Sequence, residues 1–456
     1  RNWGYDGVYP FAVQHSYGGP PGLKHFVNTC HEQGFAVILD VVYNHLGPEG
    51  NYLRDFGPYF TDRYKTPWGE AVNFDDAWSD DVRNYFIENA LHWFKNYHID
   101  ALRLDAIHAI TDMSAHPFLQ ELAEKTEDFS RHQNREYILI AESSLNDARI
   151  VKAGSQGGFG IQAQWLDDFH HSLRTILTGE KTGYYMDFGK KEQFEKSLND
   201  GFVYDGDYSA FRRRRHGNSS SEISAGQFVV FIQNHDQVGN RMLGERLTEL
   251  TSFEAHKLAA AACLLSPYLP MIFMGEEYGE KAPFLYFVDH GDPNLVDAVR
   301  NGRKKEFSQF QWRGEPPDPQ DEDTFSRSKI DISLKSRDHH RYLFKFYKEL
   351  IRLRQNYPAL KNLSNKKLKT GWDNTHNILV IHRWEGSDEM LILMNLNKEE
   401  TKLSLEIPEG YWMKILDSND SDWGGNGSVL PHELETGAGL TLTPREFILY
   451  HKENSK

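Results

Sequence analysis

Short apolar runs alternate with amphipathic stretches from about residue 20 to residue 357. The clear runs are residues 35–42, 99–105, 137–142, 228–232 and 269–274, and a weaker one lies near residues 161–165. Helical patterns cover residues 21–34, 82–97 and 343–356. Near-continuous apolar strands separated by helices are typical of a parallel sheet that is covered on both faces.

The pattern changes after Pro358. Residues 378–384, 390–396, 402–407, 411–416 and 447–450 are short apolar runs broken by Gly, Asn, Asp and Pro. This pattern predicts a small antiparallel β-sandwich of about 95 residues. We therefore predict two domains, residues 1–358 and 359–456.

Polar side chains recur at the C-terminal ends of the predicted strands. They form four groups: Asp40, Asn44 and His45; Arg103 and Asp105; Glu142; and Asn234, His235 and Asp236. A (β/α)8 barrel keeps its chemistry at this end. An open doubly wound sheet would do the same, but normally with a glycine-rich phosphate loop, and none is evident. One such carboxylate alone would more often be a helix N-cap or a solvated loop group, whereas carboxylates after three successive clear strands indicate a site.

This set of residues suits glycoside cleavage. Breaking a glycosidic bond needs one carboxylate as nucleophile and one carboxylic acid to protonate the leaving oxygen. The two must differ in environment so that their pKa values separate, and an arginine beside the nucleophile keeps it ionised. Arg103 and Asp105 are two positions apart in a strand, so their side chains share one face.

Four segments resemble the signature regions of the α-amylase superfamily, the family 13 glycoside hydrolases, and occur in the family's order. They are residues 40–45 (DVVYNH), 102–105 (LRLD), 141–142 (AE) and 233–236 (QNHD). The resemblance implies a (β/α)8 barrel in which Asp105 is the nucleophile, Glu142 the general acid/base and Asp236 the transition-state stabiliser.

The same resemblance implies further roles around the attacked sugar. His45, Arg103 and His235 would line its subsite, and Asp40 and Asn44 would mainly support the site. In secreted amylases the asparagine equivalent to Asn44 often binds calcium, but no acidic calcium loop is identified here. We therefore expect neither a metal nor a cofactor.

Other segments are similar to those of the trehalohydrolase branch of the superfamily. They are residues 2–8, 105–110, 164–171, 237–241 and 273–278. This similarity implies hydrolysis of the α-1,4 bond next to the trehalose unit of maltooligosyl trehalose, with release of trehalose. The expected partners are that substrate and related α-1,4-glucans. His108, Trp165, Asp168 and Glu277 are the candidates for contacts outside the attacked subsite.

Three alternatives stay open. A glycogen branching enzyme shares the fold and the three carboxylates, and an α-amylase would attack plain α-1,4-glucans. A non-catalytic barrel would bind glycan or a partner only, although such relatives typically lose catalytic carboxylates and this chain keeps all three. For the expected mechanism, a retaining one, the carboxyl groups of Asp105 and Glu142 should lie about 5–5.5 Å apart.

Several polar or aromatic groups allow more than one interpretation. Residues 167–171 (DDFHH) could be a sugar-contacting loop, a structural hydrogen-bond cluster or, least favoured, a metal site. Glu276 and Glu277 could begin a helix, where negative charge is favourable. Residues 212–215 (RRRR) favour a lid or a salt-bridging loop over a polyanion site. For Trp372, Trp412 and Trp423, core or interdomain packing is favoured over a glycan platform.

Composition excludes several classes of binding partner. With 51 basic and 66 acidic residues the net charge is −15, which argues against nucleic acid as the main partner. No apolar run approaches the roughly 20 residues of a membrane span, so no membrane partner is expected. Cys30 and Cys263 are expected to be buried free thiols. With no signal peptide visible, we expect a cytoplasmic protein.

The first clear strand of the barrel is expected to be the third of eight. By resemblance, Arg1 falls in the loop after the second strand. We therefore expect a barrel that is N-terminally incomplete in this chain. Because a barrel closes only when each strand is paired on both sides, we expect the isolated chain to be poorly soluble or incompletely folded.

Overall fold

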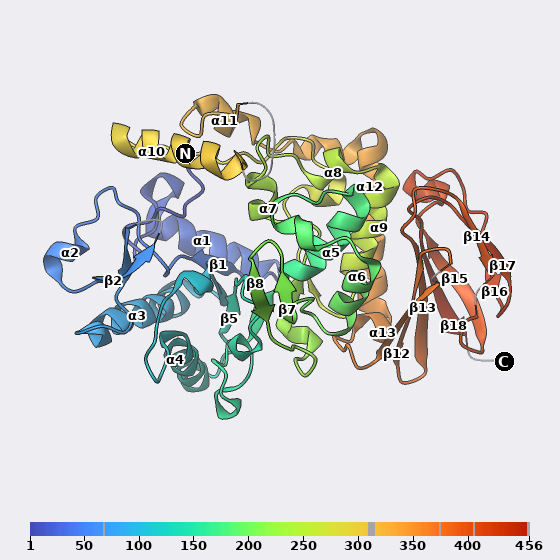
Figure 1. The fold of residues 1–456 in the computed structure, drawn as a ribbon, viewed down its shortest axis with the longest axis horizontal. Coiled ribbons are helices and arrows are strands. Elements are labelled where there is room, and N and C mark those ends of the chain that lie inside the picture. Colours follow the sequence, from blue (N-terminus) through green and yellow to red (C-terminus); the bar gives the residue numbers. More distant parts are fainter. Residues whose placement is uncertain (67–68, 309–314, 374, 405, 454–456) are drawn as a thin grey trace. The chain divides into compact units, whose positions relative to one another are not determined.

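The computed structural model describes all residues except 67–68, 309–314, 374, 405 and 454–456. The chain divides into two compact units. The first, called here the N-terminal unit, comprises Asn2–Trp165 and His290–Asp292. The second, the C-terminal unit, comprises Arg1, Leu166–Asp289 and Pro293–Lys456. Figure 1 shows the elements of both in chain order.

The N-terminal unit is built on four parallel strands in the order β1-β4-β5-β6. Their bounds are β1 Ile38–Val41, β4 Ala101–Leu104, β5 Ile138–Ala141 and β6 Ala163–Trp165. The helices between them are α1 Gly19–Glu32, α3 Ser79–Tyr97 and α4 Phe118–Gln133. Each strand lies inside the apolar run that predicts it, and β6 confirms the weak one. The chain also forms α2 Leu53–Phe56 and the hairpin β2 Phe60–Thr66 with β3 Gly69–Val72, which the sequence did not predict.

The C-terminal unit begins with helices and two further parallel strands. The strands are β9 Phe228–Val230 and β10 Leu269–Pro270. The helices are α5 Asp167–Thr178, α6 Lys191–Asn199, α7 His235–Gly239, α8 Leu247–Leu250, α9 Phe253–Leu264, α10 Pro293–Ser308, α11 Glu322–Arg327, α12 Asp338–Asn356 and α13 Pro358–Lys361. Helix α9 is buried from Ala255 to Leu264, as an alanine-rich helix that is apolar on all sides should be.

The rest of this unit is the antiparallel part that the sequence predicts. One sheet has the order β11-β12-β13-β18-β15-β16, and a second pairs β14 with β17. Their bounds are β11 Leu368–Asp373, β12 Ile378–Glu385, β13 Asp388–Asn395, β14 Thr401–Ser404, β15 Tyr411–Asp417, β16 Glu433–Leu434, β17 Gly439–Leu442 and β18 Phe447–Glu453. Side chains of both sheets pack into one core, among them Leu393, Leu403 and Leu442. The fold is therefore a β-sandwich. Residue 405, in one of the predicted runs, lies outside the described part.

The sandwich is joined to helix α9 by buried cations. The Lys257 ammonium on α9 donates to the carbonyl oxygens of Ser418 and Trp423. Arg383 on β12 donates to the carbonyl oxygen of Leu265 at 2.6 Å. Burial lowers the pKa of Lys257 to about 8. Carbonyl oxygens accept from both cations, and nearby carboxylates, the first of them Glu254, only partly oppose the effect of burial on Lys257.

Trp372, Trp412 and Trp423, the tryptophans weighed as a glycan platform, occupy different environments. Trp412 is fully buried in the sandwich core, and its indole N–H donates to the Pro408 carbonyl at 2.8 Å. Trp423 packs edge-on against Phe346 of α12. Trp372 is half-buried, and the Lys191 ammonium lies 5.4 Å from its ring centroid. Packing is thus confirmed for Trp412 and Trp423.

The basic run at residues 212–215 does not form a plain loop. Arg214 and Arg215 belong to β8 Arg214–Gly217, which pairs with β7 Asp205–Ser209 in a hairpin. Arg215 donates to the Gly206 carbonyl, and the Arg212 guanidinium lies 5.7 Å from the Tyr204 ring centroid. Arg215 therefore bonds within the hairpin, and Arg212 lies against the residue that precedes it.

Two smaller observations concern partners and thiols. Among the helices that the structure describes, none is long and apolar enough to cross a membrane. Cys263 is a buried free thiol, as predicted, whereas the free thiol of Cys30 is only partly buried. The domain boundary at residue 358 stays a prediction.

The burial of Trp412 predicts a large loss of stability on truncation. We expect Trp412→Ala to lower the free energy of unfolding of the sandwich by about 3–5 kcal/mol, because it opens a cavity and removes a satisfied indole hydrogen bond. Trp372→Ala, the matched control, should cost about 1 kcal/mol. Chemical denaturation followed by far-UV circular dichroism measures both. Equal losses for the two variants would contradict the assignment of Trp412 to the core.

Candidate active site

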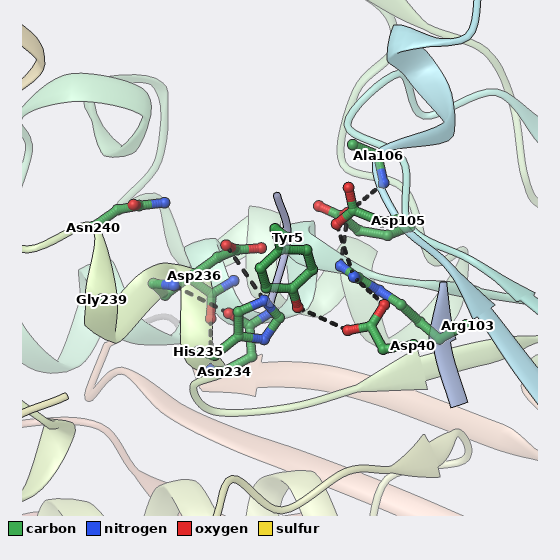
Figure 2. A network of polar contacts seen from close by, with 12 residues as sticks. Tyr5, Asp40, Arg103, Asp105, Ala106, Asn234, His235, Asp236, Gly239 and Asn240 are labelled. Carbon is green, nitrogen blue, oxygen red and sulfur yellow. Dashed lines mark hydrogen bonds and ion pairs between the residues drawn. The ribbon is translucent and has the colours of Figure 1, made fainter. Parts of the chain in front are cut away.

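A single guanidinium gathers three carboxylates in the N-terminal unit. Arg103 is 3% exposed, and its Nη1 donates to Asp40 Oδ1 at 2.6 Å and to Asp105 Oδ1 at 2.8 Å. Its Nη2 donates to Glu142 Oε2 at 2.7 Å. Figure 2 shows Arg103 between Asp40 and Asp105.

Strand register explains why these residues meet. Asp40 on β1 is the register partner of Arg103 on β4, and Arg103 is the partner of Ile140 on β5. Asp105 and Glu142 follow the last residues of β4 and β5, which also pair with each other. Because parallel strands end at the same edge, residues separated by tens of positions in sequence face one another there.

Asn44 holds the proposed nucleophile. Its Nδ2 donates to Asp105 Oδ2 at 2.8 Å and to the Asp105 carbonyl at 2.9 Å. Its Oδ1 lies 2.5 Å from Nδ1 of His45, which is itself 6% exposed. Burial lowers the pKa of His45, and the nearby charges of Asp105 and Asp6 only partly oppose this effect. These contacts are the supporting ones that the sequence predicts for Asn44.

Tyr5 belongs to this network, and sequence reasoning missed it as a site residue. Its hydroxyl donates to Asp40 Oδ2 at 2.7 Å, on the oxygen that Arg103 does not use. Its ring centroid lies 6.0 Å from the Arg103 guanidinium, and that of Trp165 lies 4.4 Å away. Tyr5 lies in the stretch 2–8, which has no periodicity. Only its place in a family-like segment could have pointed to it.

Burial and charge act in opposite directions on Arg103. Burial lowers its pKa, but the charges of Glu142, Asp40 and Asp105 outweigh burial and raise it. Arg103 is therefore a permanent cation among the carboxylates around it.

Asp236 is placed by a short capped helix in the C-terminal unit. Asn234 is the N-cap of α7: its Oδ1 accepts from the Gln237 N–H at 3.0 Å, and Gln237 Oε1 accepts from the Asn234 N–H at 3.1 Å. His235 and Asp236 are the first residues of the helix, and His235 Nε2 lies 3.5 Å from Asp236 Oδ1. Figure 2 shows Asp236 and His235 on this turn. The side chain of Asp236 is 38% exposed, so it is accessible to a ligand.

The C-terminal end of α7 is fixed as well. Arg303 of α10 donates to the Gly239 carbonyl at 2.8 Å and to Asn240 Oδ1 at 3.0 Å. Its guanidinium lies 4.8 Å from the ring centroid of Tyr286 and 4.5 Å from that of Phe307. A cation at a helix C-terminus is favourable, so both ends of this five-residue helix are stabilised.

Residues 167–171 form the first turns of α5, so the expectation of a loop there was wrong. Asp168 is 3% exposed, and its Oδ2 accepts from the Val203 N–H at 2.7 Å and the Tyr204 N–H at 3.2 Å. His170 is fully buried between the Ile232 carbonyl and the Tyr185 hydroxyl, at 2.7 and 2.9 Å from its ring nitrogens. These contacts are those of a structural hydrogen-bond cluster, because they bind α5 to the loop before β7 and to the chain after β9.

Glu276 is a buried acid and its neighbour Glu277 is half-exposed. Glu276 begins a 3-10 turn, Glu276–Tyr278, and accepts from the Tyr347 hydroxyl at 2.9 Å and Gln233 Nε2 at 3.2 Å. Burial raises the pKa of Glu276 to about 8. His108 is exposed on the turn Ile107–Ala109, with the Ser144 N–H 3.5 Å from its Nδ1. Substrate contacts of His108, Trp165, Asp168 and Glu277 stay predictions.

Metal coordination finds no support in the part of the chain that the structure describes. No group of three or more His, Cys, Asp or Glu side chains there is arranged to hold a metal ion.

The arrangement can carry acid–base and nucleophilic chemistry. Asp105 and Glu142 are two carboxylates at neighbouring strand ends that share one arginine, and one of them has further support from an amide. Such a pair can attack a carbon centre with one oxygen and exchange a proton with the other.

The central charge network predicts a stability defect. Arg103→Leu should destabilise the protein by about 3–5 kcal/mol at neutral pH, because it leaves the carboxylates of Asp40, Asp105 and Glu142 without their common cation. Arg149→Leu is the control, since the exposed Arg149 pairs with Asp147 and should contribute at most about 1 kcal/mol. Urea denaturation measures both variants, and equal losses for the two would contradict the role of Arg103.

Comparison with known proteins gives the family of the chain. A family model described as alpha amylase, catalytic domain, matches residues 73–362. The chain is similar to a malto-oligosyltrehalose trehalohydrolase of Saccharolobus solfataricus, 52% identical over 357 residues, which cover 78% of this chain and 61% of the relative. It is 42% identical over 427 residues to a protein of the same name from Mycobacterium tuberculosis, covering 92% of this chain and 73% of the relative.

Solved structures extend the similarity. A Salmonella typhimurium protein provisionally called an alpha amylase is 34% identical with a TM-score of 0.85, covering 99% of this chain and 74% of that one. An α-amylase of Geobacillus thermoleovorans has the same fold at 17% identity, with a TM-score of 0.64, covering 99% of this chain and 85% of that one. The chain thus spans about 60 to 85% of these proteins. By these matches the chain belongs to the α-amylase family, in its malto-oligosyltrehalose trehalohydrolase branch.

Proposed function

We propose that the protein is a retaining glycoside hydrolase that cleaves the α-1,4 bond next to the trehalose unit of maltooligosyl trehalose and releases trehalose. The observation that carries this proposal is the arginine-centred pair of Asp105 and Glu142, which joins two carboxylates in one network. The names of the similar proteins from Saccharolobus solfataricus and Mycobacterium tuberculosis supply the substrate class.

The two carboxylates divide the chemistry between them. Asp105 attacks the anomeric carbon while Glu142 gives a proton to the glycosidic oxygen, so trehalose leaves with that oxygen and a glycosyl ester of Asp105 remains. Glu142, now ionised, takes a proton from water, and the hydroxide oxygen displaces Asp105 from the anomeric carbon. The product is a maltooligosaccharide with retained configuration. Arg103 and Asn44 bind Asp105 and orient it for the attack.

The other predicted residues have proposed roles in stabilising charge and binding sugars. Asp236 stabilises the positive charge that develops on the sugar, and His45, Arg103 and His235 bind the sugar under attack. His108, Trp165, Asp168 and Glu277 contact neighbouring sugars. We further propose residues 1–358 as the catalytic domain, and a cytoplasmic location, which two free thiols suit.

Product analysis tests the substrate. The full chain, incubated with maltotriosyltrehalose, should release trehalose and maltotriose, whereas maltopentaose should be cleaved far more slowly. Chromatography of the products measures both reactions. Rapid attack on maltopentaose without release of trehalose would leave an α-amylase instead. New α-1,6 branches from amylose would point to a branching enzyme, to one of which the chain is 26% identical.

Removal of the acid tests the mechanism. Glu142→Gln should lower kcat by about 10²–10⁴-fold, because an amide donates no proton to the leaving oxygen. Glu124→Gln is the matched control, since Glu124 is exposed on α4 and should keep full activity. Steady-state rates of trehalose release from maltotriosyltrehalose measure the difference. If Glu142→Gln retained wild-type turnover, another residue would have to be the acid.

A further inference from the structure

Ala106, the residue after the proposed nucleophile, has an unusual backbone. Its φ of 40° and ψ of 50° are in the left-handed region, which residues other than glycine rarely adopt. An alanine there is strained, because its Cβ approaches the carbonyl oxygen. Strain of this kind persists only where surrounding contacts hold it, and it often lies at functional sites.

The contacts that hold this conformation involve the peptide unit between Asp105 and Ala106. Its carbonyl oxygen accepts from Asn44 Nδ2 at 2.9 Å. Its N–H donates to Glu142 Oε2 at 2.7 Å. One peptide group therefore connects the amide that supports the proposed nucleophile with the proposed acid/base. Figure 2 shows Ala106 beside Asp105 at this point.

Glu142 is held by its backbone as well. The Ile107 N–H donates to the Glu142 carbonyl at 3.0 Å, so two successive N–H groups of the turn after β4 bind the same residue. The turn that follows the nucleophile and the residue that follows β5 are thus fixed to each other.

The two oxygens of Glu142 are made different by these donors. Oε2 accepts from the Ala106 N–H and from Arg103 Nη2, each at 2.7 Å. An oxygen that accepts two N–H donors at this distance has no room for a proton of its own. The proton that the acid delivers is therefore carried by Oε1.

We propose that the Asp105–Ala106 peptide positions the acid/base: its N–H, together with Arg103, keeps Oε2 of Glu142 as an acceptor, so that Oε1 carries the catalytic proton toward the leaving oxygen. Ala106 is thus a positioning residue that acts through Glu142. This inference rests on the proposed role of Glu142 in the proposed function.

A purely structural role makes a different prediction. The left-handed residue also begins the turn Ile107–Ala109, in which the Ala109 N–H donates to the Ala106 carbonyl at 2.8 Å. If Ala106 served only this turn, loss of its N–H would lower stability and leave the protonation behaviour of the site unchanged.

The test removes one hydrogen-bond donor, the Ala106 N–H, from the site. Replacing Ala106 by lactic acid, through nonsense suppression in the full chain, turns the N–H into an ester oxygen and keeps the methyl group. The control is the same replacement at Ala109, whose N–H bonds only within the turn. The alkaline limb of kcat/KM against pH reports loss of the proton from the acid.

With the ester at residue 106, we expect the alkaline limb for maltotriosyltrehalose to move up by about one pH unit, because the ionised carboxylate loses a donor. kcat should fall about tenfold, since the proton is no longer confined to Oε1. The ester at residue 109 should leave the limb in place. A limb that is unmoved in both variants, with equal losses of thermal stability, would overturn the proposal.

α-Maltosyl fluoride separates the acid from the nucleophile. Fluoride leaves without a proton donor, so the kcat/KM of the residue-106 ester for this substrate should stay within about threefold of wild type. A much larger loss would mean that the peptide serves Asp105, and it would overturn the role assigned here.

A second variant covers the case in which the ester does not fold. Asn44→Ala releases the carbonyl side of the same peptide and should move the alkaline limb in the same direction by a smaller amount. Ala106→Gly, which keeps the N–H and relieves the strain, should leave the limb at its wild-type position. A limb that shifts with glycine and not with Asn44→Ala would refute the link between the peptide and Glu142.

Failure of the proposed function can be distinguished from failure of the role proposed for Ala106. If trehalose is not released, the same pH profiles are measured with whichever α-1,4-glucan the chain hydrolyses, and they still decide whether Ala106 acts on Glu142. If Glu142→Gln keeps full activity, the assignment of the acid fails first, and this inference fails with it.

Discussion

One buried guanidinium is the constraint on which the N-terminal unit depends. Arg103 has almost no exposed surface, so its charge must be answered inside the protein. It is answered by carboxylates from the ends of β1, β4 and β5. Burial of such a charge is unfavourable unless it is paired, and both terminal nitrogens of Arg103 donate to carboxylates, whereas its Nε has no hydrogen-bond partner among the described residues. This arrangement fixes the neighbouring strand ends against one another and brings the proposed nucleophile and acid within reach of a single side chain.

Backbone groups, together with Asn44, also hold the two proposed catalytic carboxylates. Asn44 holds the carboxylate and the carbonyl of Asp105, and the N–H groups of Ala106 and Ile107 hold Glu142. The surroundings of the two carboxyl groups differ: Asp105 is bound by an amide and an arginine, whereas one oxygen of Glu142 is bound by a peptide N–H and that same arginine.

The C-terminal unit uses buried cations in another way. Lys257 and Arg383 donate to carbonyl oxygens where helix α9 meets the sandwich, and Arg445 donates to the last carbonyls of α5. Carbonyl dipoles at helix ends help to solvate a buried cation. These bonds attach the sandwich to helices α9 and α5.

Local pattern was sufficient for much of this protein. Apolar runs predicted the parallel strands and most of the sandwich, because burial on both faces and alternation on one face leave a direct record in the residue types. Family-like segments made Asp105, Glu142 and Asp236 the catalytic candidates. Residues 167–171 stayed open between a loop, a structural hydrogen-bond cluster and a metal site, because their residue types suit each, and the hydrogen bonds of Asp168 and His170 to distant backbone groups show the cluster.

By itself, the sequence determined which residues could form strands and which acids could be catalytic, since both depend on residue type and spacing. Only the tertiary structure decided that Tyr5 binds Asp40, that Ala106 adopts a left-handed backbone, and that its N–H reaches Glu142. The contact of Tyr5 joins two side chains 35 residues apart, and that of Ala106 uses a backbone group, which every residue possesses, across 36 residues. The pattern of side chains along the chain reveals neither contact, because both arise only when distant segments come together.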